Sequence, residues 1–227
     1  MLEMRKKLLG AEHPDTLSSM GNLATTYSHL GKFKEAKELK VQVLDMRKKL
    51  LGAEHPDTFL SMGNLARTYF DLGNFKEAEE LEVQVLEMKK KLLGAEHPDT
   101  LSSMGNLATT YSDLGKFKEA KEVEVQVLDM RKKMLGTEHP STLLSMANLA
   151  RTYSDLGNFK EAEELEVQVL EMRKKLLGAE HPDTLLSMGN LASTYSDLGK
   201  FKEAKELKVQ VLEMRKKLLG EIGRAHV

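Results

Sequence analysis

The stretch that decides the fold runs from His55 to Glu96 and reads HPDTFLSMGNLARTYFDLGNFKEAEELEVQVLEMKKKLLGAE. Nearly all of the chain is a series of copies of this stretch. Its opening His-Pro pair recurs at a constant step of 42 residues, at His13, His55, His97, His139 and His181. A fixed period of this length is typical of a solenoid, in which each unit buries its apolar face against its neighbours. We therefore expect stacked units that present a surface for binding another protein.

Each unit is predicted to fold as two helices. The apolar residues of the first half recur every three or four positions, as one stripe on a helix does: Phe59, Met62, Leu65, Ala66, Tyr69 and Leu72. After Gly73 a second stripe follows: Phe75, Ala78, Leu81, Val85, Met88 and Leu92. Pro56 suits the first turn of a helix and Gly94 suits its end. About three residues join the two helices, so they must pack antiparallel.

This pattern resembles the tetratricopeptide repeat. The matching residues are the Leu, small residue and Tyr of the first helix, the Gly and aromatic residue of the turn, and the small residue of the second helix: Leu65, Ala66, Tyr69, Gly73, Phe75 and Ala78. Met62 stands where the common pattern has Trp, and the period exceeds the usual length of about 34 residues. The longer form, with N-L-A-x-x-Y, G-x-F-x-E-A and L-G-x-E-H-P-D, is similar to the repeats of kinesin light chains. It also resembles arrays in fungal, bacterial and invertebrate signalling proteins.

The resemblance extends over residues 1–220 and implies an all-α, right-handed superhelical solenoid of antiparallel helix hairpins. Residues 1–12 match the end of a preceding repeat's second helix, and five repeats follow, over residues 13–54, 55–96, 97–138, 139–180 and 181–220. Repeats one and three differ at only five of 42 positions, which indicates recent duplication of a two-repeat unit and argues against one specialised catalytic repeat.

The last seven residues, 221–227, break the repeat. Written as the codons GAG ATC GGA AGA GCA CAC GTC, they resemble the beginning of a common short-read sequencing adapter. We therefore expect this tail to be an artefact of sequencing or cloning. We also expect the repeats to be an internal part of a longer array, because solenoids normally end in polar capping repeats and neither end has one.

Composition excludes several classes of function. The chain has a net charge of −1 and no cysteine, so neither nucleic acid, an acidic membrane surface nor thiol chemistry is expected. No apolar run approaches the ~20 residues of a membrane helix, and the first residues lack the order of a signal peptide, so we expect a cytoplasmic protein. The chain also lacks a glycine-rich phosphate loop, a His-Glu-x-x-His motif and a nucleophile elbow. We predict no enzyme activity, no cofactor and no metal.

The resemblance implies that the first helices line a concave groove for a peptide. The candidate peptide-binding residues on the groove side of these helices are Asn22, Asn64, Asn106, Asn148, Asn190, Arg67, Arg151 and Phe70. An asparagine amide can pair with the backbone of any extended peptide, and it matches the family's peptide-contacting asparagine; the alternative is a hydrogen bond to the neighbouring helix that holds the stack. The arginines could fork onto a ligand carboxylate, or could lie on a solvated face. Phe70 could anchor a partner's side chain, or could be a tolerated surface aromatic.

Two other recurring features are expected to serve the fold. Equivalent histidines of stacked repeats lie on the order of 10 Å apart, the distance between packed helices, whereas zinc ligands must all reach one ion. We therefore expect these histidines to pack loops. The basic runs that begin at Arg47, Arg131, Arg173 and Arg215 are expected to be solvated helix ends.

These observations predict a protein–protein interaction scaffold that binds a peptide or helical segment on its concave face. The sharpest version is a fragment of a kinesin-light-chain-like cargo adaptor, which would bind the kinesin heavy chain through a coiled coil upstream. Two alternatives stay open. One is the repeat array of a nucleotide-binding, NB-ARC-type signalling protein, with a P-loop domain upstream. The other is a structural spacer without a ligand.

Overall fold

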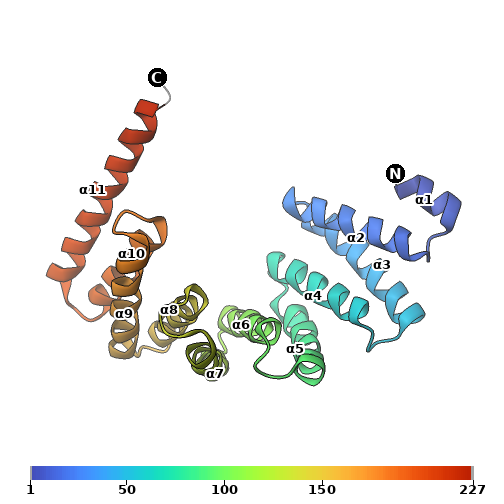
Figure 1. Cartoon of the computed structure of the whole chain (residues 1–227), viewed down its shortest axis with the longest axis horizontal. Coiled ribbons are helices and arrows are strands. Elements are labelled where there is room, and N and C mark those ends of the chain that lie inside the picture. Colours follow the sequence, from blue (N-terminus) through green and yellow to red (C-terminus); the bar gives the residue numbers. More distant parts are fainter. Residues whose placement is uncertain (1, 226–227) are drawn as a thin grey trace. The chain divides into compact units, whose positions relative to one another are not determined.

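The computed structural model describes the backbone of residues 2–225 and the side chains of residues 2–218. Every regular element within these ranges is an α-helix (Figure 1). The helices are α1 (Leu2–Leu9), α2 (Pro14–His29), α3 (Phe33–Leu51), α4 (Pro56–Asp71), α5 (Phe75–Leu93), α6 (Pro98–Asp113), α7 (Phe117–Leu135), α8 (Pro140–Asp155), α9 (Phe159–Leu177), α10 (Pro182–Asp197) and α11 (Phe201–Ala225). The all-α prediction is confirmed. The side chains of the tail, residues 221–227, lie outside the described part.

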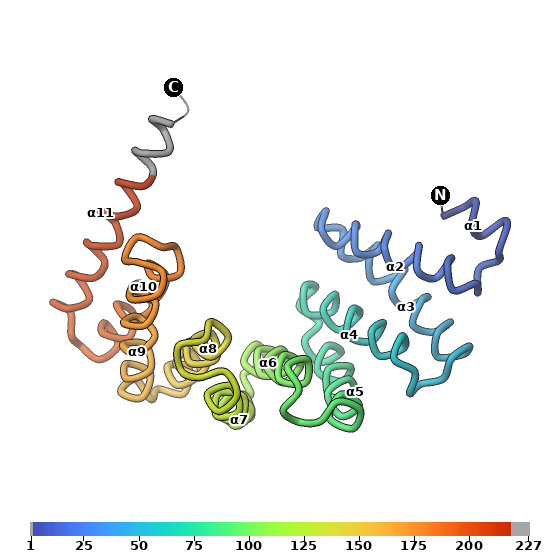
Figure 2. The backbone as a smooth tube through the Cα atoms, in the orientation of Figure 1, coloured from blue at the N-terminus to red at the C-terminus, as the bar shows by residue number. Residues whose placement is uncertain are grey.

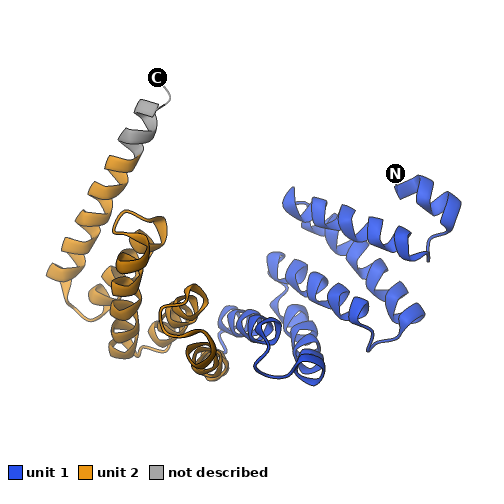
Figure 3. Ribbon diagram, viewed as in Figure 1, with its two compact units in different colours: residues 1–116 blue, residues 117–227 orange. Residues whose placement is uncertain are grey.

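The helices gather into two compact units, residues 1–116 with α1–α6 and residues 117–227 with α7–α11 (Figure 3). Within each unit, every helix packs against the helix that precedes it and the helix that follows it in the chain. Successive helices such as α4 and α5 run back and forth in the backbone trace (Figure 2). This is the packing of antiparallel hairpins that the 42-residue period predicted.

The His-Pro pairs start the first helices through a contact that the sequence did not predict. His55 precedes Pro56, the first helical residue, and its Nδ1 accepts a hydrogen bond from the backbone N–H of Asp57 at 3.1 Å. The other four histidines make the same bond: His13, His97, His139 and His181. The first N–H groups of a helix have no partner within the helix, and a side-chain acceptor just before it satisfies one of them. The histidines therefore cap the first helices, which differs from the expected role of packing loops.

Glycine ends both helices of the hairpin formed by α4 and α5. Gly73, with φ of 75°, turns the chain after α4 and donates its N–H to the Phe70 carbonyl at 2.9 Å. Gly94, with φ of 90°, ends α5 and donates to the Lys90 carbonyl at 3.1 Å. A residue with a Cβ is strained in both conformations, so glycine is the residue that suits these positions.

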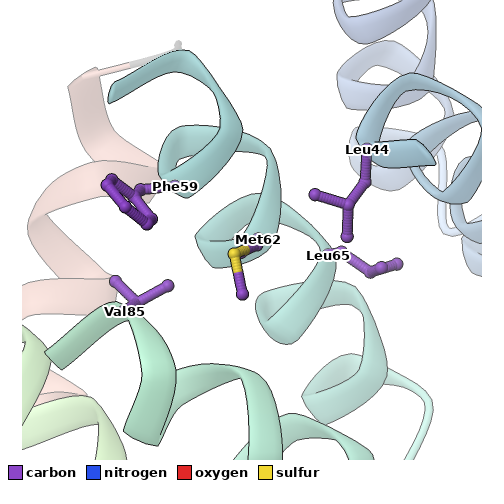
Figure 4. Packing of buried hydrophobic residues seen from close by; sticks show 5 residues of the cluster. All are labelled: Leu44, Phe59, Met62, Leu65 and Val85. Carbon is purple, nitrogen blue, oxygen red and sulfur yellow. The ribbon is translucent and has the colours of Figure 1, made fainter. Parts of the chain in front are cut away.

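The core lies between successive helices. In one cluster of the first unit, Leu44 of α3 approaches Leu65 of α4, while Phe59 and Met62 of α4 point toward Val85 of α5 (Figure 4). All five are buried, and each such side chain contributes roughly 1.5–3 kcal/mol when it leaves water. Equivalent clusters recur in the second unit, around Met146 and Met188. The stacked neighbours thus supply the cover that a single hairpin lacks.

The predicted apolar stripe matches the buried residues of α4, whereas the stripe of α5 is wrong near its end. Met62, Leu65 and Ala66 are buried and Tyr69 is half-buried, as predicted. Leu92 was placed in the buried stripe of α5, and this prediction is wrong, because its side chain is 56% exposed. The 19 residues of α5 exceed the 16 of α4, and Leu92 lies in the last turn of the longer helix. Leu86, which the stripe omitted, is buried instead.

The first basic residue of each second-helix run ties one repeat to the next. Arg47 Nη1 donates to the Asp57 carbonyl at 3.0 Å and to Ser61 Oγ at 2.9 Å, both on the following first helix. Equivalent contacts are made by Arg5, Lys89, Arg131 and Arg173. The expectation of a merely solvated helix end is therefore wrong for Arg47, Arg131 and Arg173, whereas Arg215 on α11 is exposed. The end of each second helix lies beside the first turn of the next helix, where carbonyl and hydroxyl acceptors are available.

Among residues 2–225, no helix combines the length and the apolar character needed to cross a bilayer.

Candidate functional site

A groove of about 670 Å³ opens in the first unit, between α4, α5 and α6. From α4 it is lined by Pro56, Phe59, Leu60, Gly63, Asn64, Arg67 and Phe70, from α5 by Glu82, Val85, Lys89, Leu92 and Leu93, and from α6 by Asp99, Ser103, Asn106 and Thr109. Its volume falls in the range of pockets that hold small ligands or several peptide side chains. The groove therefore brings together four of the predicted residues, Asn64, Arg67, Phe70 and Asn106.

Helix geometry explains why these side chains share one face of α4. Leu60, Asn64, Arg67 and Phe70 follow one another at steps of four, three and three residues, so they form a single stripe. The buried stripe through Met62 and its neighbours lies beside it and packs against the adjacent helices. One helix thus supplies the core with one face and the groove with another.

One end of the groove is apolar. Leu60 is 59% exposed, Leu93 is 45% exposed, and both line the groove together with Leu92 and the buried Phe59. Exposed leucines gathered in a hollow favour contact with an apolar group of a ligand. The candidate residues chosen from the sequence did not include this end. The sequence offered one signal for this end: repeat two has a leucine at position 60, whereas repeats one and three have serine there, Ser18 and Ser102.

The middle of the groove carries two unpaired amides. Asn64 and Asn106 are both exposed, and within the described part of the chain neither side chain makes a hydrogen bond. The alternative role, a hydrogen bond to the neighbouring helix, is not observed for either residue. Both amides are thus available to pair with a ligand.

Arg67 and Phe70 are engaged with each other and with their own repeat. The Nε of Arg67 lies 3.0 Å from Asp71 Oδ1, and its guanidinium carbon lies 5.5 Å from the centre of the Phe70 ring. The Phe70 ring meets Phe75 edge-on, with 5.3 Å between ring centres. Arg67 is therefore held over an aromatic face with its Nε already paired, and only its remaining N–H groups face solvent.

Glu82 is the acidic residue that α5 contributes to the groove wall. It is half-buried, and its Oε2 is buried without a hydrogen-bond partner. Burial raises the pKa of this carboxyl, and the charge of Glu79 adds to the increase, whereas the Thr110 hydroxyl and Arg67 act in the opposite direction. The Thr110 hydroxyl lies beside the Glu82 carboxyl and has no other hydrogen-bond partner. Lys89, by contrast, is paired: its Nζ donates to the Asp99 carbonyl at 3.2 Å and to Ser103 Oγ at 2.9 Å.

The other predicted residues lie outside this groove. Asn22 is exposed on α2 in the first unit. In the second unit Asn148 is half-buried and Arg151 exposed on α8, and Asn190 is exposed on α10. Among the described side chains, no three His, Cys, Asp or Glu residues converge on a point where a metal ion would bind.

Comparison with known sequences found a match to the tetratricopeptide repeat. One family with that description matches residues 16–57, 58–99, 100–141 and 142–183, at the 42-residue spacing of the His-Pro pairs. A second family with the same description matches residues 167–217. The search of curated proteins found no match.

Solved structures of similar fold include proteins with the same kind of repeat. A Podospora anserina protein assigned to the kinesin light chains, with nearly identical TPR-like repeats, is 41% identical, with a TM-score of 0.80 over 91% of this chain and 98% of that one. A variant of it is 40% identical, with a TM-score of 0.82 over the same shares of 91% and 98%. BtubC (BKLC) from P. vanneervenii shares the fold, with a TM-score of 0.77 and 21% identity over 96% of this chain and 88% of that one.

Proposed function

Because this chain belongs to the tetratricopeptide repeat family, whose helical arrays serve as protein-interaction scaffolds, we propose that the groove between α4, α5 and α6 binds a peptide segment of a partner protein. The observation that carries the proposal is the pair of exposed amides of Asn64 and Asn106, which have no hydrogen bond within the described residues. An amide offers donors and an acceptor together, so two of them, on α4 and on α6, suit the repeating N–H and C=O groups of a peptide backbone.

The groove supplies the two elements that a peptide site needs. Backbone pairing by amides gives affinity for many sequences, and side-chain contacts then select among them. The leucines at one end and the Arg67–Phe70 pair at the other offer such contacts. Neither element depends on catalysis, and the proposed role is binding alone.

The sharper form of the proposal is a cargo adaptor of the kinesin-light-chain type. Its support is the identity of 40–41% to the Podospora anserina protein over nearly the whole length of both chains. In this form the kinesin heavy chain would be a second partner, bound by a coiled coil elsewhere in the protein. The signalling-array alternative predicts a P-loop domain in its place, so the sequence encoded upstream of Met1 discriminates between them.

The peptide-binding proposal can be tested with a random dodecapeptide library displayed on phage and selected on the full chain. We expect the chain to enrich specific peptides, and the double variant Asn64→Ala, Asn106→Ala to lose them while its free energy of unfolding stays the same. The matched control is Asn190→Ala, an exposed asparagine at the equivalent position of the second unit, which should retain the peptides. A double variant that still binds would contradict the assignment of the amides. If it unfolds, they hold the stack, and a chain that enriches nothing would favour the spacer alternative.

A further inference from the structure

The charged side chains that line the groove differ in whether they have partners within the chain. Its two cations already have acceptors within the chain, since Arg67 pairs with Asp71 and Lys89 donates to Asp99 and Ser103. The groove lining has two carboxyls: Asp99 is exposed, whereas Glu82 is half-buried and its Oε2 is buried without a hydrogen-bond partner. A buried acceptor without a partner is uncommon in a folded protein, because it loses its bonds to water and gains nothing in return. Among the described residues, Glu82 thus forms no ion pair, although both cations of the lining have acceptors.

The preceding repeat shows what this position accommodates. Lys40 occupies the place of Glu82 one repeat earlier, and its ammonium donates to Thr68 Oγ1 at 2.6 Å and to Ser28 Oγ at 3.2 Å. Thr110 is the equivalent of Thr68 in the next repeat, and its hydroxyl receives no such ammonium bond, because glutamate stands in the place of the lysine. Exchange of lysine for glutamate at this position thus removes a cation and adds an acceptor.

Glu82 differs from its other equivalents in being accessible from the groove. Glu124 and Glu166 occupy the same position in later repeats and are buried, with 4% and 8% of their surface exposed. Glu82 is half-buried and lines the groove. A group in the groove can therefore approach the exposed part of the Glu82 side chain, whereas its Oε2 stays buried.

From these observations we infer the chemical class of the ligand: a peptide segment that presents a lysine or arginine to Glu82 and a large apolar side chain to the end formed by Leu60, Leu92 and Leu93. The inference rests on the proposed peptide-binding function. Ten residues of α5 separate Glu82 from Leu92, which is about 15 Å at the rise of a helix. An extended peptide spans that distance in roughly four or five residues. The ligand motif is thus a basic residue and an aliphatic or aromatic residue at that separation.

The test uses the same phage library on the full chain and on three variants whose circular dichroism matches that of the wild type. Glu82→Gln removes the charge of Glu82 and leaves that of Asp99, and Glu166→Gln is the matched control, since Glu166 is buried in the second unit. Leu60→Ser removes the apolar end and copies the residue found at Ser18 and Ser102. We expect the wild type and Glu166→Gln to enrich the basic-plus-apolar motif. Glu82→Gln should lose the basic preference alone, and Leu60→Ser should lose the apolar preference alone.

A synthetic peptide with the enriched sequence then measures the pairing directly. Its affinity should fall about tenfold on Glu82→Gln, the effect of losing one charge-assisted hydrogen bond. A peptide with alanine at its basic position should bind the wild type about tenfold more weakly than the original peptide does. The same alanine should not change the affinity for Glu82→Gln. An acidic or neutral consensus, or a basic preference that survives in Glu82→Gln, overturns the inference and leaves peptide binding standing. Failure to enrich any peptide on the wild type overturns both.

Discussion

Glu124 on α7 should destabilise the folded chain when it is ionised. Its side chain is 4% exposed, and both carboxylate oxygens are buried without a hydrogen-bond partner among the described residues. Burial raises its pKa to about 6, the Asp155 charge adds to the increase, and Thr152 and Arg151 oppose it. Because the charged form loses hydration that Thr152 and Arg151 do not fully replace, Glu124→Gln, which keeps the shape and removes the charge, should stabilise the protein at neutral pH.

The size and sign of the effect follow from the two pKa values. In the unfolded chain the pKa of Glu124 is near its ordinary value of 4.5, and in the folded chain its pKa is about 6. The folded state therefore binds the proton more tightly. Each pKa unit corresponds to about 1.4 kcal/mol, and the difference therefore gives about 2 kcal/mol. This stability is fully present below the unfolded value and is lost as the pH rises through the folded one. Glu124→Gln should thus gain about 2 kcal/mol over the wild type at about pH 8 and almost nothing at about pH 4.

Urea unfolding followed by circular dichroism at both pH values measures this difference. The matched control is Glu122→Gln on the same helix, an exposed carboxyl whose replacement should change stability little at either pH. A Glu124→Gln variant with the same gain at both pH values would refute the linkage to ionisation. A loss of stability at about pH 8 would show that the carboxylate has a stabilising partner, for which Arg151 is the nearest charged candidate.

Two further predictions concern the ends of the helices, and urea unfolding tests both. His139→Ala should lose about 1 kcal/mol, because the Nδ1 of His139 caps α8 by accepting from the Ser141 N–H at 3.1 Å, whereas His139→Asn should keep most of the stability; equal losses would exclude a capping role. Gly94→Ala should lose about 1–3 kcal/mol, because its φ of 90° suits glycine alone, although an added Cβ would meet no atom within 4 Å. Gly105→Ala, inside a helix at the position that Ala147 occupies, should gain about 0.5–1 kcal/mol, and a gain by both glycine variants would contradict the backbone argument.

The candidate site could be predicted only in part. Asn64, Asn106, Arg67 and Phe70 were found from their place on the first helix, because helix periodicity alone determines which side chains share a face. The leucines at the apolar end and Glu82 were missed. Glu82, Leu92 and Leu93 belong to α5. Whether they line the groove depends on how α5 packs against α4 and α6, which the periodicity of α5 does not specify.

The recurring histidines illustrate the same division. Their position before proline marked the helix start, and that start was predicted correctly at Pro56. The hydrogen bond from the Asp57 N–H to His55 Nδ1 depends on a side-chain rotamer that no periodicity specifies. Likewise, the basic residue at Arg47 indicated a helix end, and only packing against α4 brought Ser61 within reach.

The sequence by itself determined the period, the two helices of each repeat, the glycine turns and the buried stripe, because these depend on local geometry that is repeated at every copy. Only the tertiary structure decided which side chains near the margins of the stripe are covered. Leu86 and Leu92 are both leucines of α5, yet one is buried and the other exposed, since burial depends on the neighbouring helices. The same reason separates Glu82 from Glu124: the position in the repeat is identical, and the packing around it leaves one in a groove and encloses the other.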